Sequence, residues 1–398
     1  MMRALLNKWF IFLIIFLVLG SGFFYLFERG EKIIQIESGK ENPGDVLLEE
    51  LTPEPDLNTS PLSGLACENY NRRPFAVILA EDSVARPLSG ISMADLAIEM
   101  PVITGGITRI MAVFQCQSPE EIGSLRSARH DFIPLAMGLD AILVHWGGSH
   151  YALDLLKKKI VDNLDALVGP GQAFWRKKGI SPPHNGFTSM ENLIETAQKI
   201  GYRLESNFEG YSHIEKSKIS RQSPAKVPPQ SRYSPATAGS RNMRDGIPQI
   251  TPTADSAKGG NAGKNQKSKI KGVLKIDYPY PYNVRYEYEP ETNSYLRWRS
   301  GRPEIDRLNA KQVEAKNVVI MRASSRQLEK EYNDVDIEGG GQALFYRNGE
   351  EIEGKWQKDK SIPTSKLYFY DASQKEVEFM PGAIWIEIVE PHQQVNWK

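Results

Sequence analysis

The fold is indicated most clearly by the stretch Asp140-Ala-Ile-Leu-Val-His-Trp-Gly-Gly-Ser149. Its apolar run up to Trp146 is typical of a buried strand, and the two glycines that follow predict a turn. Ser149 is a suitable N-cap for a helix that we expect to continue to about Ile160. A strand followed directly by a helix favours a sheet with helices packed against it.

Similar elements surround this stretch. Three more apolar runs predict strands at residues 75–80, 95–100 and 107–115, and a further helix is expected over residues 190–200. Strands that alternate with helices predict an α/β (α+β) N-terminal domain over residues 61–213.

The last part of the chain has a different pattern. Six runs rich in β-branched and aromatic residues predict strands at residues 284–288, 294–298, 318–321, 343–346, 366–370 and 384–389. Asn348-Gly349 is a strong hairpin signal. We therefore expect an all-β C-terminal domain over residues 271–391.

The remaining segments connect or anchor these domains. Residues 29–60 are polar and predict a spacer, and residues 214–270 predict a disordered basic linker because they contain almost no large apolar side chains. Residues 1–28 form a cytoplasmic tip and a membrane anchor, since Trp9 to Phe27 carries no charge and would span about 28 Å as a helix.

The charges beside the anchor predict its orientation. Arg3 and Lys8 precede the apolar run, so the positive-inside rule places the N-terminus in the cytoplasm and the bulk of the chain outside the cell membrane. This predicts a single-pass protein. A cleaved signal peptide is the alternative, although its apolar core is usually shorter and is followed by small residues.

The composition of the chain limits its possible ligands further. The 398 residues include 49 basic and 49 acidic side chains, and a neutral, exported chain is not expected to bind nucleic acid. The two cysteines, Cys67 and Cys116, could form a disulfide in an oxidising compartment, and two buried free thiols are the alternative. Neither a CxxC motif nor zinc-site spacing occurs.

Three arginines are the first candidate site. Arg109 interrupts an apolar strand, and Arg126 and Arg129 share one face if their segment is helical. Guanidinium groups that converge at a sheet end are suited to phosphate or pyrophosphate, because the planar fork pairs with two oxygens. The alternative is a set of ion pairs with Glu99, Asp131 or Asp140.

The turn after the 140–146 strand is the second candidate site. His145, Gly147, Gly148 and Ser149 stand where a helix begins, and free N–H groups at a helix start bind anions. The alternatives are a tight turn and a hydrogen-bonded core histidine. Ser149 is not a hydrolase nucleophile, because the glycine required two residues later is replaced by Tyr151.

A proline-rich loop is the third candidate site. Pro182 and Pro183 present His184 and Asn185, and site residues are common on such loops. Histidine spacing does not favour a metal site made by His145, His150 and His184. Asp131 and Asp140 are carboxylates that could instead help to hold Mg²⁺ beside a bound phosphate.

Several motifs together resemble the YerB-like lipoprotein family, whose members are bacterial envelope proteins without a settled biochemical role. The motifs in the N-terminal half are Pro61-Leu-Ser-Gly-Leu65, Arg72-Arg-Pro74, Ala85-Arg-Pro87, Gly105-Gly-Ile-Thr-Arg109, Ile122-Gly-Ser-Leu-Arg-Ser-Ala-Arg129, His145-Trp-Gly-Gly-Ser149 and Pro183-His-Asn185. Those in the C-terminal half are Gly301-Arg-Pro303, Asn317-Val-Val-Ile320, the stretch from Gly349 to Trp356, and Pro381-Gly-Ala-Ile-Trp-Ile-Glu387. The chain departs from the family in its basic linker and in lacking a lipobox cysteine, since none precedes Cys67.

A weaker similarity concerns the order of elements. Thr108 to Phe114, Arg126 to Asp131 and His145 to Gly148 follow one another as in LytR-CpsA-Psr phosphotransferases. Those enzymes hold a polyprenyl pyrophosphate with arginines and Mg²⁺. The resemblance implies that Arg109, Arg126 and Arg129 hold phosphates and that Asp131 helps to hold Mg²⁺. The acidic residue that the family places just after its first arginine has no equivalent here.

Three functions therefore remain open, and whether the chain is an enzyme stays undecided. The first is an envelope protein that binds an anionic cell-wall precursor, polymer or partner. The second is a phosphotransferase acting on polyprenyl-pyrophosphate-linked glycans. The third is a non-catalytic scaffold for cell-wall synthesis proteins.

Overall fold

The structure, a computed structural model, describes residues 58–104, 106–169, 172–215 and 272–398. The expected anchor, nearly all of the spacer and nearly all of the basic linker lie outside these residues. Among the described residues, no helix combines the length and apolar character that crossing a bilayer requires.

The N-terminal half combines short helices with strands. Its strands are β1 (Phe75–Ala80), β2 (Leu96–Pro101), β3 (Thr108–Phe114), β4 (Ile122–Gly123), β5 (Ile142–His145), β6 (Asn163–Asp165), β7 (Phe174–Arg176) and β8 (Gly186–Thr188). Its helices are α2 (Phe132–Gly138), α3 (His150–Leu156) and α4 (Met190–Lys199), with 3-10 turns at Ser83–Ala85 and Ile91–Met93.

Strands alone build the described C-terminal half, as the sequence predicts. They are β9 (Val273–Ile276), β10 (Val284–Glu289), β11 (Ser294–Arg299), β12 (Arg302–Pro303), β13 (Glu314–Ala315), β14 (Asn317–Arg322), β15 (Ser325–Glu329), β16 (Tyr332–Val335), β17 (Gly339–Arg347), β18 (Glu350–Lys358), β19 (Tyr368–Asp371), β20 (Ile384–Val389) and β21 (Val395–Trp397).

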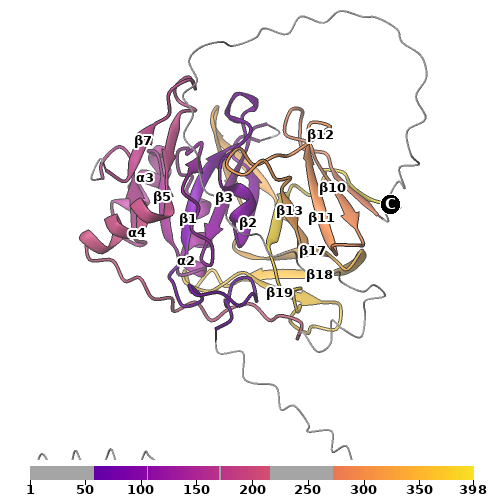
Figure 1. The fold of residues 1–398 in the computed structure, drawn as a ribbon. Coiled ribbons are helices and arrows are strands. Elements are labelled where there is room, and N and C mark those ends of the chain that lie inside the picture. The colour runs from indigo at the N-terminus through magenta and orange to yellow at the C-terminus, as the bar shows by residue number, and fades with distance from the viewer. Residues whose placement is uncertain (1–57, 105, 170–171, 216–271) are drawn as a thin grey trace, which may run out of the picture. The chain divides into compact units, whose positions relative to one another are not determined.

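The two halves share one ten-stranded sheet. Its order is β19-β18-β17-β14-β20-β2-β3-β1-β5-β6. The halves meet where β20 pairs in parallel with β2, with Leu96 opposite Ile384 and Glu99 opposite Glu387. A second sheet, made of β9 to β13 and β21, comes from the C-terminal half alone. Figure 1 shows strands from both ends of the colour bar lying side by side.

The large sheet is covered on both faces, which explains its apolar strands. Side chains alternate along β1, so that Ala76 and Ile78 enter one hydrophobic cluster while Val77 and Leu79 enter another. The first cluster contains Phe132 of α2 and Ala152 of α3. The second contains residues of α4 and tyrosines of the second sheet. Strands buried on both faces read as continuous apolar runs.

The predicted helices begin where the sequence places them. The Ser149 side chain accepts a hydrogen bond from the Ala152 N–H, and Ser189 caps α4 in the same way through Asn192. Helix α3 ends at Leu156, earlier than the expected Ile160. The chain turns there, and Lys159 takes a left-handed φ of 54° that ends helical geometry.

Candidate functional site

The candidate residues gather at one edge of the large sheet. Strands β1, β5 and β6 run parallel, so their carboxyl ends meet at this edge. Arg109 begins the antiparallel β3 opposite Ala80, the last residue of β1, which brings it to the same edge. Ligands of open α/β sheets bind at the carboxyl ends of parallel strands.

Arg126 and Arg129 reach this edge on an extended segment. The prediction of a shared helical face for them is wrong, because α2 begins only at Phe132. The Arg126 N–H donates to the Ile78 carbonyl, and the Arg126 carbonyl accepts from the Trp146 N–H. The segment therefore lies between β1 and the turn after β5, where backbone hydrogen bonds of a strand type hold it.

The three arginines form a cluster with little neutralising charge. Arg109 donates to the Ser127 carbonyl at 2.7 Å, and Arg129 donates to the Ala128 carbonyl at 3.2 Å. Neither makes an ion pair within 4.0 Å among the described residues. The Nε atoms of Arg109, Arg126 and Arg129 are buried and have no hydrogen-bond partner there.

Burial and mutual repulsion both act on these cations. Burial holds the pKa of Arg109 well below its ordinary value, and the charges of Arg129 and Arg126 lower that pKa further. Burial also lowers the pKa of Arg129, whose guanidinium lies 5.2 Å from the ring centre of Tyr332. The protein thus concentrates positive charge at a place where water cannot solvate it fully.

Asp82 and His184 complete the accessible side of the cluster. Arg126 Nη2 lies 3.4 Å from Asp82 Oδ2, and His184 Nδ1 lies 3.8 Å from the same oxygen. Burial and the neighbouring Arg126 charge lower the pKa of His184. The structure therefore brings His184 to Arg126, as an anion site would require.

The glycine turn has a structural explanation instead. The buried His145 places Nδ1 2.8 Å from the Gly147 carbonyl oxygen, the Gly147 N–H donates to Asp165, and the Ser149 N–H donates to the Ala128 carbonyl. These contacts account for His145, Gly147 and Ser149 as parts of the turn, and their contact with a ligand stays a prediction. Gly148 pairs with Ala128 in an isolated bridge.

Asn185 is held by a neighbouring arginine. Its side-chain oxygen accepts from Arg176 Nη1 at 2.7 Å, and the guanidinium of Arg176 lies 4.0 Å from the ring centre of Trp146. These contacts keep the proline-rich loop against the turn. Asn185 therefore positions His184 rather than joining the arginines.

The two candidate metal carboxylates have different surroundings. Asp140 binds Arg203 Nη2 at 2.5 Å and the Asn207 N–H at 2.7 Å, so basic and backbone donors occupy it. Asp131 lies next to His130 and Asp334, and one oxygen of each carboxylate and one ring nitrogen all lie within 4.8 Å of one another. Of the two, only Asp131 stands in a group that could hold a cation.

A buried ion network between the two sheets was not predicted from the sequence. Arg299 binds both oxygens of Glu99, at 2.7 and 2.6 Å. Arg297 binds Glu304 at 2.5 Å, and it also pairs with Glu99 and Glu387. Glu99 and Glu387 each interrupt an otherwise apolar strand, and a lone carboxylate in such a strand is a signal that could have indicated a buried partner.

The pKa values within this network diverge. Burial alone would raise the pKa of Glu99, but the charges of Arg299 and Arg297 outweigh burial and lower it to about 2. Burial raises the pKa of Glu81 to about 8, although Arg299 Nε lies 3.1 Å away and partly opposes the shift. The Glu81 carboxyl group is therefore held in its protonated form at neutral pH.

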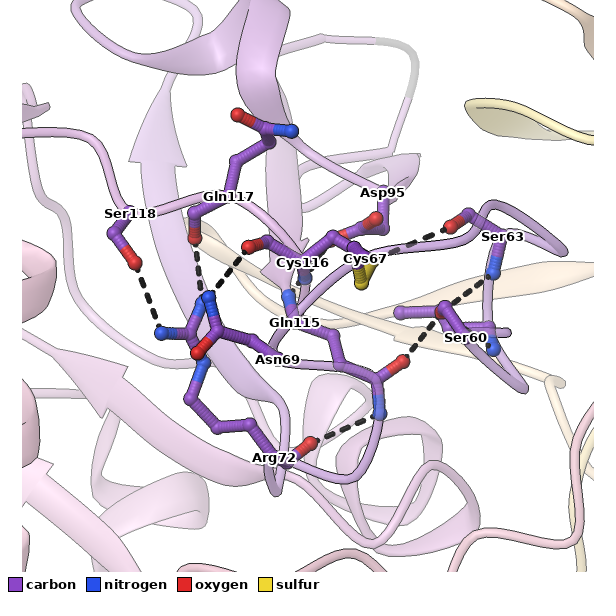
Figure 2. Close-up of a disulfide and its surroundings, with 11 residues drawn as sticks. Ser60, Ser63, Cys67, Asn69, Arg72, Asp95, Gln115, Cys116, Gln117 and Ser118 are labelled. Carbon is purple, nitrogen blue, oxygen red and sulfur yellow. Dashed lines mark hydrogen bonds between the residues drawn. A yellow bond between two sulfur atoms is a disulfide. The ribbon is translucent and has the colours of Figure 1, made fainter. Parts of the chain in front are cut away.

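A disulfide ties the start of the described chain to the end of β3. Figure 2 shows the bond between Cys67 and Cys116, whose Cα atoms lie 5.7 Å apart. The Cys116 N–H and the Gln115 N–H both donate to Asp95. Such a bond persists in an oxidising compartment.

Two family profiles match the chain. "Protein of unknown function (DUF3048) N-terminal domain" matches residues 62–203, and the corresponding C-terminal domain matches residues 274–386. The chain is 31% identical over 338 residues to a protein of Bacillus subtilis (strain 168) named "Putative lipoprotein YerB", covering 83% of this chain and 86% of that protein.

A solved structure agrees with this match. The crystal structure of the YerB protein from Bacillus subtilis superposes with a TM-score of 0.66 at 28% identity, covering 85% of this chain and 99% of that one. The resemblance to YerB-like proteins is thereby confirmed, whereas the weaker similarity to phosphotransferases stays a prediction. Both domains and most of the chain's length match, so this protein belongs to the DUF3048 family.

Proposed function

We propose that this protein is anchored in the cell membrane, faces the extracytoplasmic side, and binds an anionic ligand with the cluster of Arg109, Arg126 and Arg129. The location is supported by the similarity to a putative lipoprotein and by the disulfide. The apolar run Trp9–Phe27 would serve as the membrane anchor.

The observation that carries the proposal is buried positive charge without matching carboxylates. Among the described residues, Asp82 is the one carboxylate within 4.0 Å of any of the three guanidinium groups. Buried charges are normally paired, since an unpaired one is costly. A bound anion would supply the missing negative charge.

Exposure indicates which residues the ligand would touch. The side chains of Arg126 and His184 are 18% and 15% exposed, whereas Arg109 and Arg129 are more deeply buried. Arg126 and His184 would therefore contact the ligand directly. Arg109 and Arg129 would attract it through their charge without touching it. A phosphate, a pyrophosphate or an acidic wall polymer offers suitable oxygens.

Binding of defined probes to the full chain, extracted from membranes in detergent, tests the proposal. Inorganic pyrophosphate and farnesyl pyrophosphate are titrated into the parent protein and into Arg126→Ala. Loss of one charge-assisted hydrogen-bond donor predicts at least about tenfold weaker binding, with a nearly unchanged Tm. Recovery of the full chain from the soluble fraction without detergent would contradict the anchor.

Arg302→Ala is the matched control, because Arg302 is an exposed arginine on the short strand β12. It should bind both probes as the parent does. Equal weakening in both variants would show a general charge effect and would overturn the proposed site. A large fall in the Tm of Arg126→Ala would assign that arginine to the fold instead.

A further inference from the structure

A second site is indicated beside the arginine cluster, by residues that come from both halves of the chain. His130 and Asp131 precede α2, whereas Asp334 lies on β16. His130 Nε2 lies 3.4 Å from Asp131 Oδ1 and 3.3 Å from Asp334 Oδ1. The possible ligand atoms of the three residues all lie within 4.8 Å of one another.

Their spacing fits a small metal ion. Tetrahedral ligands about 2.1 Å from a zinc ion stand about 3.4 Å from one another. One imidazole nitrogen and two carboxylate oxygens suit zinc and similar divalent transition metals, whereas magnesium and calcium favour oxygen ligands alone. Three protein ligands leave a fourth position for water or a substrate.

The surroundings of the Asp131 carboxylate are an independent indication that a cation binds here. It is 3% exposed, and its Oδ1 accepts a hydrogen bond from the Val335 N–H at 3.0 Å. Its Oδ2 is buried and has no hydrogen-bond partner among the described residues, and the same holds for His130 Nδ1. A buried carboxylate oxygen left without a partner is costly, and a cation would offset that cost.

The three residues line a pocket through which an ion can reach them. The pocket has a volume of about 480 Å³ and is also lined by Asp336 and Glu338, whose negative charge favours a cation. Arg326 opposes this, because its Nε and Nη2 each lie 2.8 Å from Asp334 Oδ2. Its side chain is 77% exposed and can swing into water when a metal binds.

We propose that His130, Asp131 and Asp334 form a binding site for a divalent transition-metal ion that opens into this pocket. The site uses none of the three arginines, so the inference does not depend on the proposed anionic ligand. The site would also explain why polar side chains stand at the interface between α2 and the β15–β16 hairpin. A purely structural contact there could have been apolar.

Titration of the full chain in detergent with Zn²⁺, and separately with Co²⁺, tests the site. The parent protein should bind one equivalent of each metal and gain thermal stability as metal is added. Asp334→Asn should bind at least about tenfold more weakly. His130→Gln should change the visible absorption of bound Co²⁺, because a nitrogen ligand is replaced.

Two further variants separate ligands from general charge. Asp336→Asn removes an acidic residue of the same pocket and should change the affinity by less than about threefold, since screening weakens charges that are not ligands. Arg326→Gln removes a competing cation and should tighten binding. Absence of binding by the folded parent, or equal weakening in Asp334→Asn and Asp336→Asn, would overturn the site.

Discussion

The protein buries arginines in two places, and their surroundings are opposite. Arg297 and Arg299 lie between the sheets among four glutamates, Glu81, Glu99, Glu304 and Glu387. Arg109, Arg126 and Arg129 lie at the sheet edge, where Asp82 is, among the described residues, the one carboxylate within 4.0 Å of any of their guanidinium groups. The first group is matched within the fold, so it holds the two halves together. The second group is left unmatched, which is expected of a site that awaits a ligand.

The largest effect on the free energy of unfolding is expected for Arg297→Met, which tests the first group of arginines. The substitution leaves Glu99, Glu304 and Glu387 buried with reduced pairing, and removal of one partner from a buried ion pair costs about 3–5 kcal/mol of folding free energy. Urea denaturation should show this loss. Arg297→Lys keeps the charge but loses the planar fork, so it should fall between the parent and Arg297→Met. A loss below about 1 kcal/mol would mean that the network does not hold the halves together.

A second test uses the pH dependence of stability to probe the carboxyl group of Glu81. The folded-state pKa of Glu81 is about 8, above its usual value of 4.5, so the folded state binds this proton more tightly than the unfolded state does. The resulting stability is fully present below pH 4.5 and is lost as the pH rises to about 8. Each pKa unit corresponds to about 1.4 kcal/mol.

Glu81→Gln keeps the shape of the protonated acid and removes this dependence. The variant should match the parent near pH 5 and have a higher Tm at pH 9, measured by thermal unfolding. Glu353→Gln, at an exposed position of β18, provides a carboxyl control and should follow the parent at both pH values. A parent protein whose Tm advantage over Glu81→Gln grows with pH would contradict the assignment.

The smallest expected effect is on stability at the arginine cluster. Arg109→Met removes a buried cation that Arg126 and Arg129 repel, and it sacrifices one hydrogen bond to Ser127 worth about 1 kcal/mol. These effects oppose each other, so the free energy of unfolding should stay within about 1 kcal/mol of the parent. A loss as large as that of Arg297→Met would place both arginine groups in the fold and remove the contrast.

Much of the fold could be predicted from local patterns. Strands β1, β2, β3 and β5 follow from apolar runs, and the cap Ser149 sets the start of α3. The pairing of β2 with β20 could not be predicted, because no local pattern records which distant strands meet. The same limit explains why the two halves were expected as separate domains, whereas they share a sheet.

The candidate site was predicted only in part, because the sequence does not record which distant residues come together. The positions of Arg109, Arg126 and Arg129 in the sequence predicted a cluster. The structure brings these residues close enough for the charges of Arg126 and Arg129 to lower the pKa of Arg109. The roles of His145 and Ser149 could not be separated from those of a ligand site, since a tight turn needs the same residue types. Asp334 was not found because its partners lie some 200 positions earlier in the chain.

The pairing of β2 with β20 sets the order in which the chain can fold during synthesis. Strand β2 is made early, yet its neighbour at residues 384–389 is made about 280 residues later. At about 5–20 residues per second, the growing chain carries an open, apolar strand edge for roughly 15–60 seconds. An edge of this kind is a template for wrong pairing. The nascent chain would therefore benefit from a chaperone that covers residues 96–101 until β20 has been made.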